Sequence, residues 1–381
     1  MPYEFRQMIT RREREQFLTL AWQFYKDDPV WAPPNMPDYR KRIDPKRGAW
    51  FQRGEAEFYL LEQDGEPIGR FSIGIDHAAN RKGNKLEAVM GFFEVIEDYA
   101  AAQAIFQFCQ RWARQHGMRT VYGPFNLDYE DAYGLVTQGW EEPLVMLCGQ
   151  NPPYYLDFFQ RYGWQPGRPA NIAMRIDLTR PRPEFERLRT MADKLRAADL
   201  YAVRSPDFRR WQDEIDVLHN LLNRALAHLE GHIPWERAAV EALVEPFRLI
   251  ADPEMLLFIV DKRSGETIGF LPATPDMNEH FRRFDGLRHW WNYPGFLLNM
   301  RKPTDCLTIK SVLMLPEYWG SGAAILLFDE MRRRVLAKGK SSWVDLSLTA
   351  VDNPQTPKLG KKLGAEIYRM YQVFRIDAVE G

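Results

Sequence analysis

The stretch Leu313-Met-Leu-Pro-Glu-Tyr-Trp-Gly-Ser-Gly-Ala-Ala-Ile-Leu-Leu327 decides the fold class of this chain. An apolar strand leads into a glycine-rich turn, and the turn opens a helix that keeps Ala324, Leu327 and Phe328 on one face. The backbone N–H groups of such a turn and the positive end of the helix point toward one place. The stretch therefore predicts an anion site suited to a pyrophosphate, although a plain strand-to-helix turn has the same pattern.

Two short motifs recur in the chain at the same spacing of 200 residues. Gly-Glu-x-Ile-Gly occupies 65–69 and 265–269, and Arg-Ile-Asp occupies 175–177 and 375–377. One match of this length would be noise, but two matches with one spacing indicate a duplicated architecture. We therefore expect two domains of similar design, at 1–179 and 185–381, joined by a proline-rich linker at 180–184.

Both predicted domains follow one order of elements. A strand and a helix are followed by a hairpin, a strand, a helix, a strand, a late helix and a closing strand. The hairpins turn at Asp64-Gly65 and Ser264-Gly265, since apolar strands around such pairs favour hairpins. We expect the closing strands at 173–178 and 368–378. This order predicts an α/β fold in which each domain is a mixed, mostly antiparallel sheet flanked by helices.

The two copies differ most in two long insertions. The first copy has extra residues at 123–150, and the second has extra residues at 275–304. Both segments are polar and aromatic, and the second contains His-Trp-Trp-Asn-Tyr at 289–293. Long connections inside compact domains are uncommon and often functional. We therefore expect these insertions to shape a pocket for an acceptor molecule.

Composition excludes several classes of partner. The 381 residues include 51 Lys and Arg against 52 Asp and Glu, so no overall field would attract nucleic acid or a membrane. Cys109, Cys148 and Cys306 lack the spacing of a metal site or a disulfide framework. The first residues are charged, and no apolar window approaches the roughly 18 residues of a membrane span. We expect a cytoplasmic monomer or homodimer that binds a small-molecule acceptor and no metal.

The chain resembles the GCN5-related N-acetyltransferase (GNAT) superfamily in its tandem, two-domain form. The acyl-CoA loop of that family has Arg or Gln, two residues, Gly, one residue, then Gly or Ala, and this chain fits it at Gly320, Gly322 and Ala324. The resemblance covers nearly the whole chain and implies acetyl-CoA or another acyl-CoA as co-substrate. The residues that it assigns to this co-substrate are Leu313, Met314, Leu315, Trp319, Gly320, Ser321, Gly322, Ala323, Ala324 and Asn353.

The departures from the family pattern separate the two copies. Trp319 stands where the family has Arg or Gln, and Gly360 stands where it often has the Tyr that protonates the leaving thiolate. The first copy has Glu97 and Asp98 where the phosphates would lie, and like charges there exclude CoA. We therefore expect the second domain to bind acyl-CoA and the first to be a degenerate partner.

The resemblance implies direct attack of an acceptor amine on the thioester, with the backbone N–H of Leu313 or Met314 polarising the carbonyl. The amine must first lose a proton. Candidate bases are Glu94, Asp128, Glu130 and Asp345, although a solvated or capping carboxylate is the more common explanation of each of them. Candidate acids for the thiolate are Tyr133, Tyr318 and Tyr368, although a buried tyrosine is commonly part of a core.

Three functions remain open on the sequence. The first is an N-acyltransferase, with acetyl-CoA as the expected donor and a small-molecule or amino-acid-like amine as the acceptor. The second is a non-catalytic protein that binds a CoA ester or an apolar ligand, which Trp319 and Gly360 favour. The third is a transferase for long acyl chains or aminoacyl groups, with which the aromatic insertions are compatible.

Overall fold

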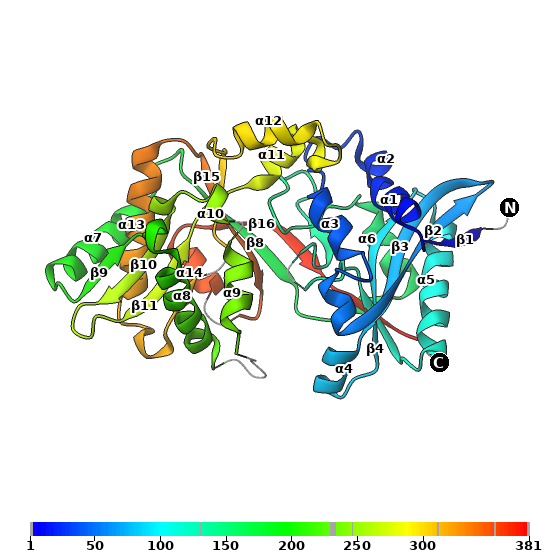
Figure 1. Ribbon diagram of the computed structural model, residues 1–381, viewed down its shortest axis with the longest axis horizontal. Coiled ribbons are helices and arrows are strands. Elements are labelled where there is room, and N and C mark those ends of the chain that lie inside the picture. The colour runs from blue at the N-terminus through cyan, green and yellow to red at the C-terminus, as the bar shows by residue number, and fades with distance from the viewer. Residues whose placement is uncertain are drawn as a thin grey trace.

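The computed structural model describes residues 3–129, 131–228, 234–245, 247–310, 312–353 and 356–378. Within these residues the strands form three sheets, and helices cover them in two halves that lie side by side (Figure 1). Most neighbouring strands are antiparallel, and β4–β5 and β13–β15 are parallel pairs. This arrangement confirms the predicted α/β fold class.

The N-terminal half consists of the N-terminal sheet, of order β1-β2-β3-β4-β5-β17-β7, and helices α1 to α6. Helix α5 packs Ala101, Ile105 and Cys109 into a core shared with β3 and β4. The strands are β1 (Glu4–Gln7), β2 (Gly54–Gln63), β3 (Glu66–Asp76), β4 (Glu87–Val95), β5 (Thr120–Gly123), β7 (Gln165–Pro166) and β17 (Phe374–Asp377). The helices are α1 (Arg11–Thr19), α2 (Ala21–Tyr25), α3 (Met36–Arg42), η1 (Ala49–Gln52), α4 (His77–Gly83), α5 (Tyr99–Gln115) and α6 (Tyr154–Tyr162).

The C-terminal half consists of two sheets and helices α7 to α14. Its small sheet has the order β14-β11-β10-β9, and its central sheet has the order β12-β13-β15-β8-β16-β6. The strands are β6 (Leu135–Gln138), β8 (Asn171–Asp177), β9 (Tyr201–Arg204), β10 (Leu256–Asp261), β11 (Thr267–Pro272), β12 (Thr274–Pro275), β13 (Cys306–Thr308), β14 (Leu313–Met314), β15 (Trp343–Ala350) and β16 (Glu366–Gln372). The helices are α7 (Pro183–Ala197), η2 (Phe208–Arg210), α8 (Trp211–Leu226), α9 (Arg237–Val244), α10 (Phe247–Ile250), η3 (Pro253–Met255), α11 (Met277–Arg283), η4 (Asp285–Leu287), α12 (Asn292–Asn299), η5 (Pro316–Tyr318), α13 (Ala323–Lys338) and α14 (Thr356–Lys362).

The closing strands of the two copies are exchanged between the halves. Strand β8, at the end of the first copy, lies between β15 and β16 in the central sheet. Strand β17, at the end of the second copy, lies between β5 and β7 in the N-terminal sheet. These strand pairs join segments from opposite sides of the expected linker at 180–184. The last residues of that linker already form the start of α7. The domain limits at 179 and 185 stay a prediction, because each half is completed by the other copy.

Each insertion also reaches the opposite half. In the first insertion, β6 pairs with β16 of the central sheet. In the second, the segment from α11 to α12 contacts the N-terminal half: Arg282 donates to the carbonyl oxygen of Val30, 2.8 Å away, and the Trp22 indole donates to Asp285. The two insertions therefore connect the halves. The second insertion, with α11 and α12, lies above the space between them (Figure 1).

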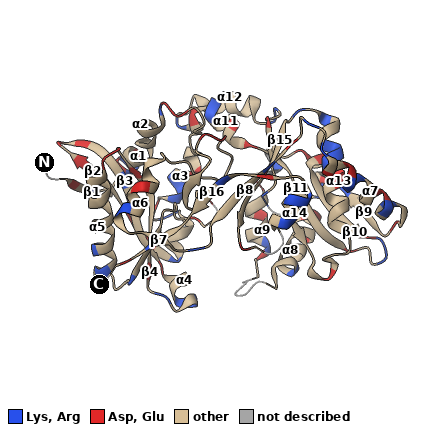
Figure 2. Cartoon of the chain, turned by 180° about the vertical axis from the view of Figure 1, so that it is seen from behind, with Lys and Arg blue, Asp and Glu red and all other residues tan. Residues whose placement is uncertain are grey.

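Charged residues of both signs are interspersed along the chain in both halves (Figure 2). Helix α13 illustrates the pattern, because Asp329 and Glu330 form ion pairs with Arg332, Arg333 and Arg334. In the residues that the structure describes, no helix combines the length and the apolar character needed to cross a membrane.

Candidate active site

The site begins where a predicted single strand, 306–315, divides between two sheets. Its first part, β13, belongs to the central sheet, where Ile309 N–H donates to the Asp345 carbonyl oxygen at 2.9 Å. Its second part, β14, belongs to the small sheet, where Leu315 N–H donates to the Ile268 carbonyl oxygen at 2.9 Å. Lys310 lies at the point where the two sheets diverge. The division separates the two sheets from Lys310 onward.

The glycine-rich turn follows β14 and starts α13, as the sequence predicts. Gly320 and Gly322 have φ values of 80° and 90°, which glycine adopts without strain. A Cβ at Gly322 would lie 2.9 Å from the Leu195 side chain, whereas one at Gly320 would meet no described atom within 4 Å. Gly322 therefore lets α7 pack closely, and the open surface at Gly320 leaves room for a ligand at the helix start. The assignment of these residues to acyl-CoA stays a prediction.

Strand β14 lies at an edge of the small sheet, and its register determines which backbone groups point outward. Leu315 bonds to Ile268, so the alternation of an antiparallel pair turns Leu313 inward and Met314 outward. The Trp319 indole donates to the Met314 carbonyl oxygen at 3.2 Å, which agrees with that orientation. Of the two N–H groups expected to polarise a thioester, the register therefore favours that of Met314.

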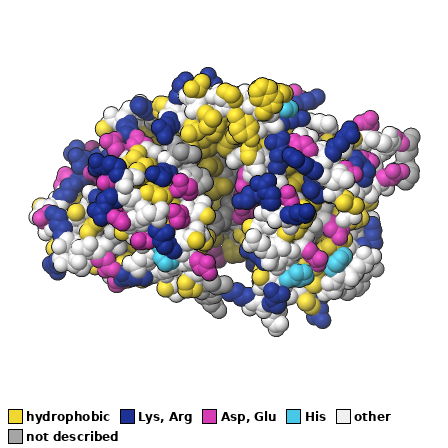
Figure 3. Space-filling view, in the orientation of Figure 1, with side chains coloured by type: hydrophobic (Ala, Val, Ile, Leu, Met, Phe, Trp, Pro, Cys, Tyr) yellow, Lys and Arg dark blue, Asp and Glu magenta, His cyan; other side chains and the backbone are white. Residues whose placement is uncertain are grey.

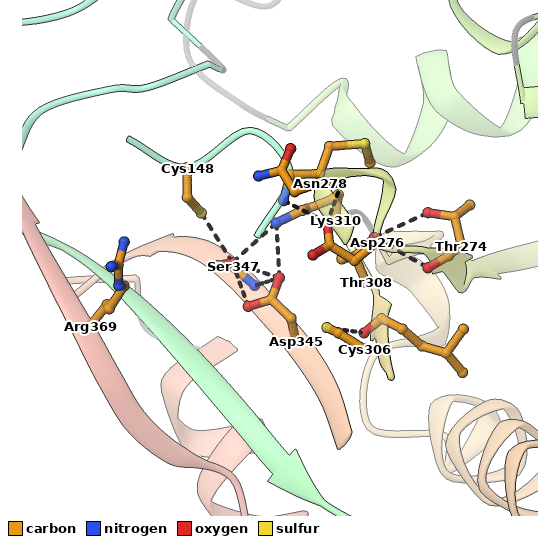
Figure 4. Close-up of polar contacts among 12 residues, drawn as sticks. Cys148, Thr274, Asp276, Asn278, Cys306, Thr308, Lys310, Asp345, Ser347 and Arg369 are labelled. Atoms are coloured by element: carbon orange, nitrogen blue, oxygen red, sulfur yellow. Dashed lines mark hydrogen bonds and ion pairs between the residues drawn. The ribbon is translucent and has the colours of Figure 1, made fainter. Parts of the chain in front are cut away.

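A buried polar cluster lies where the sheets diverge, built from Lys310, Asp345, Ser347 and Tyr368. Figure 4 shows the first three of these residues. The Lys310 ammonium lies 2.8 Å from Asp345 Oδ2 and 3.1 Å from Ser347 Oγ. Ser347 and Tyr368 donate hydroxyl hydrogen bonds to Asp345, at 2.6 and 2.8 Å. Asp345 has 0% exposure, so its charge is compensated by these three partners.

The surroundings determine the charge of the cluster. Burial disfavours the Lys310 ammonium, but the nearby Asp345 carboxylate outweighs it and raises the lysine pKa above its usual value. Burial raises the pKa of Tyr368 and of the neighbouring Cys148 thiol, so both stay protonated at neutral pH. The cluster thus offers a fixed positive charge and a neutral hydroxyl rather than a free base.

A second buried carboxylate, Asp276, lies beside Lys310 at the start of α11 (Figure 4). Its Oδ1 accepts from the backbone N–H of Met146 at 2.8 Å and of Asn278 at 3.2 Å. Burial raises its pKa to about 7, against the lowering effect of the Met146 hydrogen bond and the Lys310 charge. A carboxylate that titrates near neutral pH is suited to accept a proton from an amine.

The first insertion fits against this cluster from the other copy of the fold. Met146 binds Asp276, and Cys148 Sγ lies 3.5 Å from Ser347 Oγ. Arg369 of β16, with 0% exposure, holds the insertion by donating to the carbonyl oxygens of Trp140 and Glu142. Residues from both copies therefore contact this cluster, and the role of the insertions in shaping an acceptor pocket stays a prediction.

The corresponding region of the N-terminal half is filled by its own side chains. Glu94 of β4 accepts hydrogen bonds from Tyr25 and Tyr155, each 2.9 Å long, and lies 3.5 Å from Arg70. Val95 N–H donates to the Tyr155 hydroxyl, so the end of β4 already has a partner. Glu94 is thus part of a buried hydrogen-bond network with Tyr25, Tyr155 and Arg70.

The other candidate residues have separate surroundings. Tyr133 packs near Phe125 in the N-terminal core, and Tyr318 donates to Asp261 at the end of β10, so the structure does not bring them to Asp345. Asn353 Oδ1 accepts from Thr356 N–H at the start of α14. Asp128 lies 3.4 Å from Arg42. Glu130 falls outside the described residues.

Gly360 has a structural explanation in the strand exchange. A Cβ at this position would lie 2.8 Å from the sulfur of Met174, which belongs to β8. The strand supplied by the first copy thus occupies the space of a larger side chain. Of the tyrosines named as candidate acids, Tyr368 is the one whose hydroxyl donates to Asp345, at 2.8 Å.

Sequence reasoning named Asp345 and Tyr368 but missed Lys310, Ser347 and Asp276. Lys310 directly follows the strand-like run Cys306–Ile309, and a lysine in that position is the sequence pattern that could have indicated a buried charge. Asp276 had no such signal, because its burial depends on Met146, 130 residues away. The described part of the chain contains no group of three or more His, Cys, Asp or Glu side chains arranged to hold a metal.

Two curated proteins are similar to the chain. The bacterial ceramide synthase of Caulobacter vibrioides is 25% identical over 271 residues, covering 71% of this chain and 69% of that protein. Protein YghO of Escherichia coli K12 is 22% identical over an alignment of 386 positions, covering 97% of this chain and 94% of that protein. No family model matches the chain.

Solved structures show the fold. A tandem GNAT protein from the clavulanic acid biosynthesis pathway has a TM-score of 0.59 at 15% identity and covers all of both chains. A GCN5-related N-acetyltransferase from Sphaerobacter thermophilus has a TM-score of 0.53 at 14% identity and covers 100% of this chain and 96% of its own. The chain therefore has the tandem GCN5-related N-acetyltransferase fold, as the stretch at 313–327 and the repeated element order predict.

Proposed function

We propose that the protein is an acyl-CoA-dependent N-acyltransferase that forms an amide between a long acyl chain and a long-chain amine. The observation that carries the proposal is the division of one strand between two sheets in the C-terminal half. This division places the glycine-rich turn and the outward edge of β14 next in the chain to the buried Lys310 cluster. The N-terminal half has no equivalent among its described residues, because Glu94 and its partners fill the space.

In this proposal the Met314 N–H and the Lys310 ammonium stabilise the negative oxygen that forms when the amine attacks the thioester. The carboxylate of Asp276, with its pKa of about 7, takes the proton that the amine must lose. The new C–N bond forms, the C–S bond breaks, and the thiolate of CoA takes up a proton. Tyr368 is the hydroxyl that we assign to this last step.

Two observations favour long chains over an acetyl group. Ceramides are long-chain amides, and a relative with 25% identity over 71% of this chain bears the name of a ceramide synthase. Figure 3 shows a hollow between the two halves in which hydrophobic side chains are visible. An apolar hollow favours alkyl chains, since each buried CH₂ contributes roughly 0.8 kcal/mol.

The test compares acetyl-CoA with palmitoyl-CoA, each with a long-chain amine such as sphinganine or with a short amine. Mass spectrometry detects the amide, and a thiol reagent measures the CoA released. We expect equal amounts of amide and CoA with palmitoyl-CoA and sphinganine, and at least tenfold less with the short partners. Preference for acetyl-CoA would overturn the chain-length assignment, and binding without any amide would favour the non-catalytic alternative.

A further inference from the structure

We propose that α12, together with Trp290 and Trp291 just before it, binds the surface of an anionic lipid bilayer and inserts its outward side chains there. The proposal rests on features separate from the acyl-transfer site. It assigns a role to the part of the second insertion that does not contact the Lys310 cluster.

The outward face of this segment is apolar and unusually exposed. Trp290 and Trp291 are 78% and 58% exposed, and Leu297 and Leu298 are 59% and 81% exposed. Pro294, also exposed, lies between them in the chain. Within α12, positions 294, 297 and 298 have helical spacing and share one side, and the two tryptophans lie in the turn just before the helix. Figure 3 shows hydrophobic side chains gathered over α12 at the top of the molecule.

The opposite face of the segment already has its partners. Phe296 stacks on Phe281 at 5.8 Å, and with Met300 it packs against the cluster that α11 and η4 form. The inner face therefore holds the helix in place. A helix that is apolar on both sides is ordinarily buried on both, so the outward face lacks a covering surface among the described residues.

The charges around this face favour an anionic partner. Arg282, Arg283, Arg301 and Lys302 are exposed at the ends of α11 and α12. The acidic residues of the same segment face inward, since Glu279 accepts from the backbone N–H of Cys306 and Asp285 accepts from Trp22. Basic side chains beside an exposed apolar helix with tryptophans are typical of segments that lie in the interface of anionic bilayers.

A bilayer fits these features better than a second copy of the chain. Pairing two copies through this face would bring the same cluster of cations together, which costs free energy. Tryptophan side chains also prefer the interface between lipid and water. The expectation of no membrane partner was based on net charge and on the length of apolar windows. A short exposed apolar face changes neither quantity, so those two criteria do not detect it.

The position of α12 connects this surface with the proposed reaction. The segment lies above the hollow between the halves (Figures 1 and 3). A protein docked through α12 would therefore hold that hollow close to the bilayer. Under the proposed function, long-chain substrates would then enter from the lipid phase without crossing water.

The test is flotation of the purified chain with vesicles of phosphatidylcholine alone or with 30% phosphatidylglycerol added. We expect binding to the anionic vesicles that falls several-fold in 0.5 M salt. The double variant Leu297→Asn/Leu298→Asn should bind about tenfold more weakly. The matched control is Met191→Asn/Leu243→Asn, which changes two exposed apolar residues on α7 and α9 and should bind within twofold of the wild type.

Circular dichroism should show both double variants folded, because the changed side chains are exposed. Absence of binding by the wild type, or equal binding by the α12 variant, would overturn the proposal. So would a dimer in sedimentation velocity that only the α12 variant dissociates. Amide formation from detergent-dispersed substrates is measured separately, so failure of membrane binding and failure of the proposed reaction remain distinguishable.

Discussion

The two halves share an order of elements but use the space beside the same strand in opposite ways. In the N-terminal half, β4 is continuous from Glu87 to Val95. The backbone N–H of Phe92, within this strand, donates to the side-chain oxygen Asn126 Oδ1. In the C-terminal half, the equivalent strand is divided into β13 and β14, and Lys310 occupies the division. The same strand of the duplicated fold is therefore continuous in one half and divided in the other.

The helices that follow these strands, α5 and α13, differ in how their first turns are capped. Helix α5 begins at Asp98, whose side chain accepts from Ala100 N–H and from the Tyr3 hydroxyl. Helix α13 begins at Gly322, which has no side chain, and Ser321 Oγ accepts only from Ala323 N–H. An acidic cap satisfies the helix start internally, whereas a glycine leaves room for an anion.

The largest expected effect comes from placing a negative charge in the glycine-rich turn before α13, because the N-terminal half has the acidic residues Glu97 and Asp98 at the corresponding place. Gly320→Asp places a carboxylate where we expect the diphosphate, in open space; the positive φ strains any side chain there, and the control Gly320→Asn shares that strain. Calorimetry should show at least a hundredfold loss of acyl-CoA affinity. Gly320→Asn, with the same shape and no charge, should lose less than tenfold. Equal losses for the two variants would show that sterics, and not charge, matter there.

The next comparison uses one buried ion pair from each half. Lys310→Met removes the positive charge beside Asp345 and should lower kcat about a hundredfold while the KM for acyl-CoA changes little. Glu94→Gln alters the pair with Arg70 in the N-terminal half and should leave kcat within twofold, although it lowers the free energy of unfolding by about 1–3 kcal/mol. Steady-state kinetics and urea unfolding check both. A large fall in kcat for Glu94→Gln would indicate that the reaction takes place in the N-terminal half, which would contradict the proposal.

The third prediction concerns pH. Because the pKa of Asp276 is about 7, the rate should rise as the pH passes through that value and level off above it. Asp276→Asn should lower the rate at pH 8 by about thirtyfold and remove this ionisation from the profile. The stability effect has the opposite direction. The folded pKa is raised above the unfolded value of about 3.9, so the neutral acid's contribution is present below pH 4 and is lost as the pH rises through 7.

The smallest effect concerns Trp319. Its indole donates to the Met314 carbonyl oxygen, and the residue is 44% exposed. Trp319→Arg restores the cation that the family has at the start of the loop and should tighten acyl-CoA binding about three- to fivefold. Trp319→Phe removes only the indole hydrogen bond and serves as the control. Weaker binding of the Arg variant would indicate that the indole itself contacts the co-substrate.

Local patterns predicted much of the fold. The hairpins at Gly65 and Gly265, the turn at Gly320 and the helix behind it depend on residues close in the chain, so a single sequence reveals them. The exchange of β8 and β17 was not predicted, because strand pairing depends on contacts far apart in sequence. An identical Arg-Ile-Asp in both strands is consistent with either partner.

The candidate site was predicted less completely than the fold. Asp345 was among the named carboxylates because it lies in an apolar strand pattern, and its partners Lys310 and Ser347 were missed. Their proximity results from the division of one strand and from the parallel pairing of β13 with β15. Burial raises the pKa of Asp276, and the insertion from the other copy donates a backbone hydrogen bond from Met146 to its carboxylate. Neither effect has a signature in local sequence.

The central claim is that one half alone binds acyl-CoA, and a binding stoichiometry tests it most directly. Isothermal titration with a hydrolysis-resistant thioether analogue of a long-chain acyl-CoA, kept below its micelle concentration, counts the sites. We predict one site per chain, with an affinity unchanged in Glu97→Ala, whose exposed carboxylate precedes α5 in the N-terminal half. Two sites per chain, or loss of the single site in Glu97→Ala but not in Gly320→Asp, would contradict the account.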